Sequence, residues 1–376
     1  MNKRIACCIL AVLMMASLVA CGNSAAPQSS AESTAPTAST ADSAPSQEGA
    51  TRGATGPLAV RYGSAGTGNS DYAEAGTIIN HLNSEGILPA GSNVTQEVVL
   101  SGLGSAAYVI EGGLADICRS QNALAATRGV EGRAPVTKVR ALMAASGTSI
   151  SIQVISPDFR NKTGYTSVED VITDEFACTI VTEDVGSTDY TVMLYLFETY
   201  GLTFDDFYAW GGKIVFTDNN TASEMIQDGT ADIMVTHSTL ASSMVTELCM
   251  TTDVYLASFS DKVLDYFTQN GFALRTIPAG TFDRFEEDVL SPYVGISFIV
   301  SEDMDFDTAY SLTKALIESA APLREVSTSL RNLTFEHCVN QEITVVPLHE
   351  GAVAYYQDIG VLDADGKYIG EGPGIY

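Results

Sequence analysis

Apolar and polar residues are arranged along residues 57–376 in a way that predicts strands and helices in turn. The first expected strand is the apolar run at 58–63, and apolar residues then repeat at helical spacing. Strands separated by helical segments favour a parallel sheet, so this region is predicted to form an α/β lobe. Its further strands are expected at 94–100, 115–120, 139–145 and 149–155.

A second series of the same kind begins near Pro157, with strands expected at 176–182, 213–217 and 231–235. A strand at 293–300 is expected to return the chain to the first lobe. Two discontinuous α/β lobes joined by two chain crossings predict a receptor with a cleft between them. The expected boundaries are 57–152 plus 295–365 for lobe 1, 153–294 for lobe 2 and 366–376 for a C-terminal tail.

The first twenty residues have a different pattern. Residues 2–4 include Lys and Arg, and residues 5–20 form an apolar run that is too short for a membrane span of ~20 residues. The run ends in Leu-Val-Ala-Cys-Gly at 18–22, which resembles the lipobox of bacterial lipoproteins. We therefore expect a lipoprotein signal peptide at 1–20 and lipidation of Cys21. An ordinary secretory signal is the alternative.

Residues 21–56 are rich in Ala, Ser, Thr and Pro and show no periodicity. Such a segment buries too little apolar area to offset the entropy cost of ordering, so we expect a disordered tether. A lipid and a tether predict an extracytoplasmic domain anchored to the cell membrane. No later apolar run reaches about 18 residues, so no further span is expected.

Charge and length narrow the function classes. The chain has 376 residues, with 46 acidic and 19 basic side chains, and its net charge is −27. Such a chain repels a phosphate backbone, which argues against nucleic acid as a partner and against polybasic binding to lipid. The length allows about two domains of ~150 residues each. Four cysteines follow the proposed lipid site, and buried thiols are favoured over two disulfides: Cys118, Cys178, Cys249 and Cys338.

Seven short motifs occur in order between residues 58 and 362: YGSAGTG (62–68), LSGLGS (100–105), GLADI (113–117, with Gln121), VGST (185–188), GTAD (229–232), IPAGTF (277–282) and VPLHEGA (346–352). Together they resemble the TAXI family, the extracytoplasmic solute receptors of TRAP transporters. The sequence departs from the family pattern at Glu350, which replaces a proline, and at Arg119, which replaces an apolar residue. Ligand identity therefore does not carry over.

The resemblance implies a two-lobed, periplasmic-binding-protein-like (type II) fold. It also implies an extracytoplasmic solute receptor. We expect its solute to be small and anionic or zwitterionic, of the dicarboxylate or acidic amino acid class. The partner would be an integral-membrane TRAP permease driven by an ion gradient, and the receptor itself would need no cofactor and catalyse no reaction.

Three turns are the expected binding elements, because each joins a strand end to a helix start. Such turns offer backbone N–H groups and the positive end of a helix dipole to an anion. Tight connections without a ligand are the alternative. The candidates are Ser64, Gly66, Thr67, Gly68, Asn69, Ser70 and Tyr72 in and after the first turn, Ser101, Gly102 and Ser105 in the second, and Gly186, Ser187 and Thr188 in the third.

Three further side chains are candidates at strand ends. Arg119 either binds a solute carboxylate through its guanidinium or forms a structural salt bridge. Gln121 lies two residues on and matches a cleft position of the family. His237 ends a strand of lobe 2 and can face the cleft. The chain has no HExxH or GxSxG motif, so neither a metal site nor a serine hydrolase is expected.

Three alternative functions stay open. The first is a receptor for an ATP-driven importer of a pyrimidine-like or sulfonate-like solute. The second is an exported enzyme on the same scaffold, against which the missing catalytic motifs count. The third is a surface-interaction lipoprotein with a vestigial cleft.

Overall fold

The structure is a computed structural model that describes residues 52–373, apart from 68, 85, 122–127, 131, 239, 241, 283, 326, 328–329, 332 and 371. The predicted signal peptide, Cys21 and the tether up to residue 51 lie outside the described residues. Residues 51–376 form one compact unit, and the fold below is that of this unit alone. Within its described part, no helix combines the length and apolarity needed to cross a membrane.

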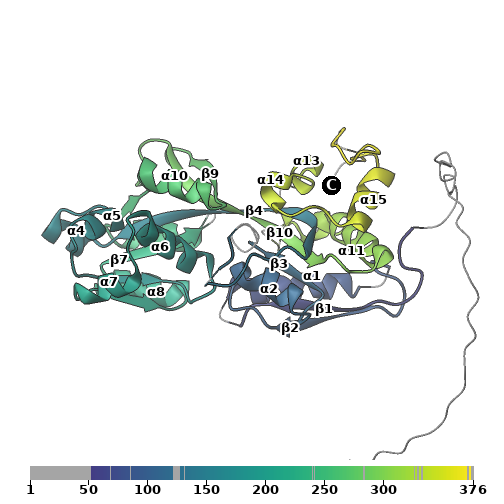
Figure 1. The fold of residues 1–376 in the computed structure, drawn as a ribbon, viewed down its shortest axis with the longest axis horizontal. Coiled ribbons are helices and arrows are strands. Elements are labelled where there is room, and N and C mark those ends of the chain that lie inside the picture. Colours follow the sequence, from purple (N-terminus) through teal and green to yellow (C-terminus); the bar gives the residue numbers. More distant parts are fainter. Residues whose placement is uncertain are drawn as a thin grey trace, which may run out of the picture. The chain divides into compact units, whose positions relative to one another are not determined.

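The described strands form one mixed ten-stranded sheet with the order β2-β1-β3-β10-β4-β7-β5-β6, while β8 pairs with β4 and β9 with β10 (Figure 1). The pairs β1–β2, β1–β3, β5–β6 and β5–β7 are parallel, as predicted. The strands are β1 (Ala59–Ser64), β2 (Asn93–Val98), β3 (Ile117–Ser120), β4 (Val139–Ile155), β5 (Thr179–Thr182), β6 (Lys213–Phe216), β7 (Ile233–Ser238), β8 (Tyr255–Ala257), β9 (Ala273–Ile277) and β10 (Val289–Ser301).

Two long strands, β4 and β10, join the two groups of strands (Figure 1). They pair antiparallel with each other over residues 139–150 and 293–301. One part of β10 pairs with β3 in lobe 1, and the far part of β4 pairs with β7 in lobe 2. The sequence predicted two strands at 139–145 and 149–155, but they are one continuous strand. This is the predicted two-lobed α/β fold, with β4 and β10 as the connection.

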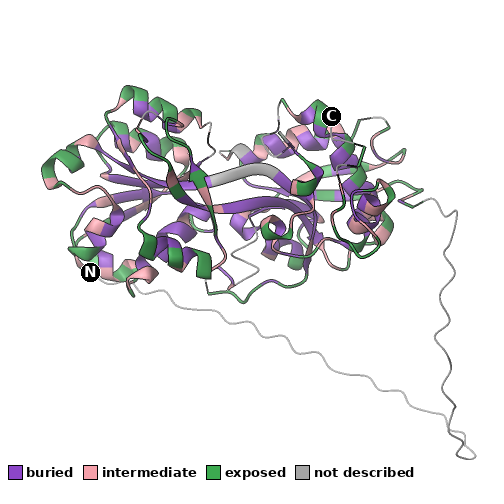
Figure 2. Ribbon diagram, turned by 90° about the horizontal axis from the view of Figure 1, so that it is seen from above, coloured by how far each residue is buried: buried purple, intermediate pink, exposed green. Residues whose placement is uncertain are grey.

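Helices cover both faces of the sheet, and the buried residues follow the strands (Figure 2). Lobe 1 carries α1 (Ser70–Leu82), η1 (Leu103–Ser105), α2 (Ala106–Glu111), α11 (Phe306–Glu318), α12 (Ala320–Leu323), α13 (Phe335–Cys338), α14 (Gln341–Thr344) and α15 (Glu350–Asp358). Lobe 2 carries α4 (Pro157–Thr163), α5 (Val168–Thr173), α6 (Thr188–Thr199), α7 (Phe204–Ala209), α8 (Asn219–Gln227), α9 (Ser243–Thr251) and α10 (Asp261–Gln269).

The four cysteines of the described part are all buried, and none forms a disulfide: Cys118, Cys178, Cys249 and Cys338. Burial raises the pKa of the Cys118 thiol well above its usual range and that of Cys178 to about 12. These thiols therefore stay protonated and pack as small apolar groups. The prediction of buried thiols is confirmed.

Candidate functional site

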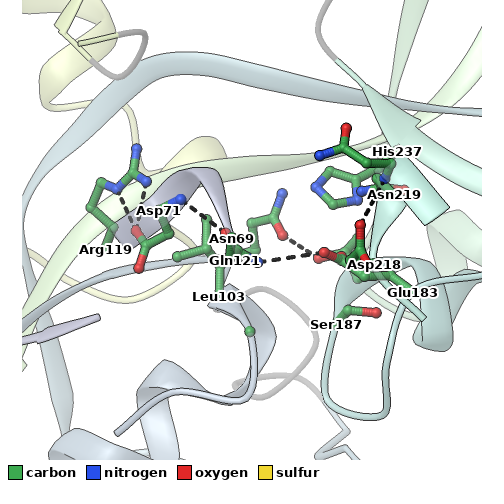
Figure 3. Close-up of a pocket in the computed structure, with 13 residues that line it drawn as sticks. Asn69, Asp71, Leu103, Arg119, Gln121, Glu183, Ser187, Asp218, Asn219 and His237 are labelled. Carbon is green, nitrogen blue, oxygen red and sulfur yellow. Dashed lines mark hydrogen bonds and ion pairs between the residues drawn. The ribbon is translucent and has the colours of Figure 1, made fainter. Parts of the chain in front are cut away.

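A cavity of about 180 Å³ lies between the two lobes and is lined by polar residues of both (Figure 3). Three hollows of about 420 to 590 Å³ are each lined by one lobe only, so they are not the predicted cleft. Lobe 1 contributes Asn69, Asp71, Gly102, Leu103, Arg119 and Gln121, and lobe 2 contributes Glu183, Ser187, Thr188, Asp218, Asn219, Asn220 and His237.

Three helices, α1, α6 and α8, begin at this cavity because a capping side chain starts each of them there. Asn69 accepts a hydrogen bond from the backbone N–H of Asp71 at 2.9 Å, and Ser187 accepts one from Tyr190 at 3.0 Å. Asp218 caps α8 in the same way. Each cap lines the cavity, so three positive helix ends point towards it, which favours a negatively charged group of a solute.

The two lobes touch where two of the predicted turns meet. A Cβ atom on Gly102 would lie 3.1 Å from the carbonyl oxygen of Gly186, so only a residue without a side chain fits there easily. The hydroxyl of Thr188 donates to Oε1 of Gln121, which bridges the lobes beside this contact. The amide of Asn69 donates to Glu183, from the other lobe, at 3.4 Å. The lobes are therefore in contact around the cavity.

Arg119 is buried and bound by two acids of α1. Its Nη2 lies 2.6 Å from Asp71 and its Nη1 lies 2.5 Å from Glu74. Burial alone would lower the pKa of Arg119, but these two carboxylates raise it above the ordinary value. Asp71 also accepts the backbone N–H of Ala65 at 2.8 Å, so the ion pair fixes the first turn to α1. Arg119 thus forms the structural salt bridge that was the alternative to a solute clamp.

His237 on β7 is bound to Asp189 of α6. Its backbone N–H donates to Oδ1 of Asp189 at 2.6 Å, and its Nδ1 contacts the same oxygen. Burial alone would lower the pKa of His237, but the charge and hydrogen bond of Asp189 raise it to about 9. Burial, assisted by repulsion from Asp189, raises the pKa of Glu183 to about 7. Because its pKa is about 9, the imidazole of His237 is protonated at neutral pH.

The same three side chains are the one group in the described part that could hold a metal ion. One ligand atom from each of Glu183, Asp189 and His237 lies within 4.8 Å of the other two. However, Nδ1 of His237 contacts Asp189 directly, so no cation fits between those two atoms. The positive imidazole already balances one carboxylate. We therefore assign no metal ligands here.

Seven of the predicted site residues line the cavity: Asn69, Gly102, Arg119, Gln121, Ser187, Thr188 and His237. Gly68 and the side chain of Ser70 lie outside the described residues. Ser64 is fully buried and accepts a hydrogen bond from Gln96 at 2.9 Å, so its side chain binds the protein and not the cavity. The predicted residues that are not among those lining the cavity are Ser64, Gly66, Thr67, Tyr72, Ser101, Ser105 and Gly186.

Six lining residues were not predicted: Asp71, Leu103, Glu183, Asp218, Asn219 and Asn220. Asp71 and Leu103 lie inside or beside turns that were proposed. Glu183 directly follows β5, and the other three begin two residues after β6. The carboxyl ends of these two parallel strands lie at the same edge of the sheet, where the proposed third turn also begins. The sequence signal was the polar run at 218–220 after a strand, which also starts a helix.

Comparisons with known proteins found one matching family model and several similar solved structures. Residues 63–360 match the model of the NMT1-like family. Similar solved structures include a protein from Bordetella bronchiseptica RB50, with a TM-score of 0.44, 16% identity and 84% of both chains covered. The alkanesulfonate-binding protein SsuA from Xanthomonas axonopodis pv. citri has a TM-score of 0.40 and 11% identity over 72% of this chain and 76% of that one.

A further similar structure is a binding protein component of an ABC phosphonate transporter from Pseudomonas aeruginosa. Its TM-score is 0.41, with 12% identity over 70% of this chain and 74% of that chain. The matching family model is described as NMT1-like and not as TAXI, so the TAXI resemblance of the motifs stays a prediction.

Proposed function

The chain belongs to the NMT1-like family, a family of solute-binding proteins, and we propose that it is the extracytoplasmic receptor of a membrane importer. The observation that carries this proposal is the cavity between the lobes, which is lined by polar side chains and capped helix starts from both. A solute held there contacts both lobes at once. Binding therefore favours the closed arrangement of the lobes over an open one. The size of this preference is the difference between the binding free energies of the solute in the two arrangements.

Closure takes place about the two strands that join the lobes. Because β4 and β10 pair with strands of both lobes, a small change of twist along them moves one lobe against the other. The closed face, which includes the contact of Gly102 with Gly186, is then the surface that a permease distinguishes from the empty receptor.

The solute is small. A cavity of about 180 Å³ is below the roughly 300–1,000 Å³ of pockets for drug-sized ligands. The three helix starts favour a carboxylate or another oxyanion, whereas Glu183 and Asp218 favour an amine on the same molecule. We therefore propose an anionic or zwitterionic solute, of the dicarboxylate or acidic amino acid class. A sulfonate-like or pyrimidine-like solute is the alternative.

The importer is of the ATP-driven type, because the NMT1-like family is one of periplasmic binding proteins of ABC importers. A TRAP permease, driven by an ion gradient, is the second candidate, and the ordered series of TAXI-like motifs favours it. Uptake of labelled solute distinguishes them in cells that express the receptor and its permease. ATP depletion at a maintained ion gradient stops the first type, and an ionophore at maintained ATP stops the second.

A thermal-shift panel tests the receptor function itself. It contains carboxylates, amino acids, sulfonates and pyrimidines, each with the mature protein. A solute at 100 times its Kd stabilises the folded state by about 2.7 kcal/mol, so one class raises the melting temperature clearly. The bound solute is then released by denaturation and recovered unchanged. A panel in which no solute raises the melting temperature contradicts a receptor of these classes, and turnover of the solute contradicts a receptor without catalysis.

The N-terminal pattern adds a proposal on location. Cleavage before Cys21 and lipidation of its thiol would leave the receptor tethered to the membrane by the segment after Cys21. This tether would end before Arg52 and Gly53, which bind Asp358 of α15 and Asp307 of α11. In an expressing bacterium, the wild-type protein is expected in the membrane fraction, and Cys21→Ser releases it to the soluble fraction. A variant that stays membrane-bound contradicts lipid anchoring at this residue.

A further inference from the structure

Two residues that line the cavity carry positive charge, Arg119 and His237, and they offer a solute very different contacts. Arg119 lies 2.6 Å from Asp71 and 2.5 Å from Glu74, and only 4% of its side chain is exposed. Two protein carboxylates already balance its charge. His237 instead shares one carboxylate, and 22% of its side chain is exposed. The cation that a solute can reach is therefore His237.

Asp189 fixes the orientation of this imidazole. One oxygen of Asp189 accepts the backbone N–H of His237 at 2.6 Å and also contacts its Nδ1. Asp189 lies in the first turn of α6 and is completely buried, so the carboxylate cannot move aside without opening the core. The imidazole of His237 lines the cavity (Figure 3). Because Nδ1 contacts Asp189, Nε2 is the ring nitrogen that is left for a solute. Nε2 has no hydrogen-bond partner among the residues that the structure describes.

We propose that His237 is the residue that recognises an oxyanion of the solute through Nε2–H, and that Asp189 is its positioning residue. This inference rests on the proposed receptor function and names the group that binds the charged oxygen of the solute. Carboxylates and sulfonates both offer an oxygen that carries negative charge, and this oxygen is the group that His237 would recognise. A protonated imidazole bound to such an oxygen forms a charge-assisted hydrogen bond.

The neighbouring charges set the pH range of this contact. Asp189 and Glu183 act on His237, and Asp184 and Asp218 act on Glu183. Because the pKa of His237 is about 9, the imidazole keeps its proton at neutral pH and loses it only above that value. The pKa of Glu183 is about 7, so its carboxyl is partly protonated at neutral pH and repels an oxyanion less than a full charge does. Oxyanion binding should therefore weaken as the pH rises, most strongly through pH 9.

The test measures binding of two probes, glutarate and methanesulfonate, by calorimetry from pH 6 to 10 on the mature protein. His237→Gln keeps a hydrogen-bond donor but removes the charge. It is expected to weaken the preferred probe about ten-fold or more at pH 7 and to abolish the loss of affinity near pH 9. The preferred probe distinguishes a carboxylate from a sulfonate as the recognised group. A His237→Gln variant with wild-type affinity and an unchanged pH profile overturns the proposal.

Asp189→Asn tests the positioning role separately, with Asp265→Asn on the exposed face of α10 as its matched control. Burial lowers the pKa of His237 and the charge of Asp189 raises it, so the pKa is expected to fall in this variant. Binding should then be lost at a lower pH than in the wild type. A variant that weakens binding equally at all pH values shows a merely structural role and overturns the positioning role. NMR of the protein labelled with ¹⁵N-histidine reports the imidazole directly, and His237→Gln identifies its signal.

Two further outcomes separate this inference from its premise and from a metal site. If a probe binds while the free His237 signal titrates near pH 6.5, the receptor function stands and this inference fails. If neither these probes nor any solute of the thermal-shift panel binds the wild type, the receptor function fails and this inference fails with it. Dialysis against EDTA is expected to leave the affinity unchanged. A loss of affinity that Zn²⁺ alone restores overturns the assignment in favour of a metal.

Discussion

Arg119 lies between Asp71 and Glu74, and its removal leaves two carboxylates buried without their cation. Arg119→Ala is therefore expected to lower the free energy of unfolding by about 3–5 kcal/mol, measured by urea denaturation. Arg61→Ala is the matched control, because Arg61 pairs with Asp116 at 2.7 Å with 45% of its side chain exposed. That exposed pair contributes about 0–1 kcal/mol. An Arg119→Ala protein of wild-type stability that has lost solute binding would restore the solute-clamp hypothesis.

Gly102 tests the contact between the lobes. A methyl group at this position would lie 3.1 Å from the carbonyl oxygen of Gly186, so Gly102→Ala is expected to hinder closure and weaken solute binding several-fold. Unfolding stability should change little, because the methyl group meets the other lobe and not its own core. Gly66→Ala is the control, since no atom lies within 4 Å of the position its methyl would take. Calorimetry that finds equal affinity in both variants contradicts closure at this contact.

At the scale of single residues, the sequence indicates where Arg119 and His237 lie but not which side chains they bind. Arg119 and His237 lie next to the last residue of their strands, and both line the cavity between the lobes. Asp71 on α1 and Asp189 on α6 each lie 48 residues before the cation that they bind, and no local pattern reveals such a pairing. Asp71 and Asp189 both follow a capping residue in a first helical turn, so they read as helix-start acids. In the fold, Asp71 pairs with Arg119, which is buried, and Asp189 pairs with His237, which is partly exposed.

At the scale of elements, β10 carries an irregularity where α14 packs on it. The register of β10 against β4 shifts between Gly295 and Ile296. A Cβ atom on Gly295 would lie 2.4 Å from the side chain of Ile343 in α14. Gly295→Ala is therefore expected to displace α14 and lower the free energy of unfolding by about 1–3 kcal/mol.

Gly76→Ala is the matched control for that change. Gly76 lies inside α1, and the nearest atom to its added methyl would be the Gln96 amide oxygen at 3.4 Å. Alanine favours a helix over glycine by about 1 kcal/mol, so this variant should be neutral or slightly more stable. Thermal unfolding of the two proteins decides the point. Equal effects of both substitutions contradict a close contact at Gly295.

The same strands show how far the sequence predicts elements. Each strand of the described sheet that was predicted is present within a few residues of its expected bounds. The error was to divide β4 in two at the polar residues 146–149. β10 pairs with β4 on both sides of this segment, at 139–145 and again at 148–150, and β7 pairs with β4 from residue 150 onward. Pairing with distant strands therefore outweighs the local signal for a break. This strand is the connection between the lobes, and the sequence did not identify it as such.

At the scale of the whole molecule, the net charge of −27 opposes the arrival of an anion. The local donors that favour an oxyanion lie inside the cavity and act only over short distances, whereas the field of the whole surface acts during approach. Salt shortens the range of that field from about 30 Å at 0.01 M to about 8 Å at 0.15 M ionic strength. The association rate constant of a dianionic solute is therefore expected to rise several-fold over this range.

A zwitterion without net charge provides the contrast, because the surface field neither attracts nor repels it strongly. Its association rate constant should stay constant within about two-fold over the same salt range. Stopped-flow fluorescence of Trp210, the single tryptophan of the chain, can follow both reactions. A rate constant for a dianion that falls with salt would mean that the solute meets a locally positive entrance. In that case the charge of the whole chain would not govern capture.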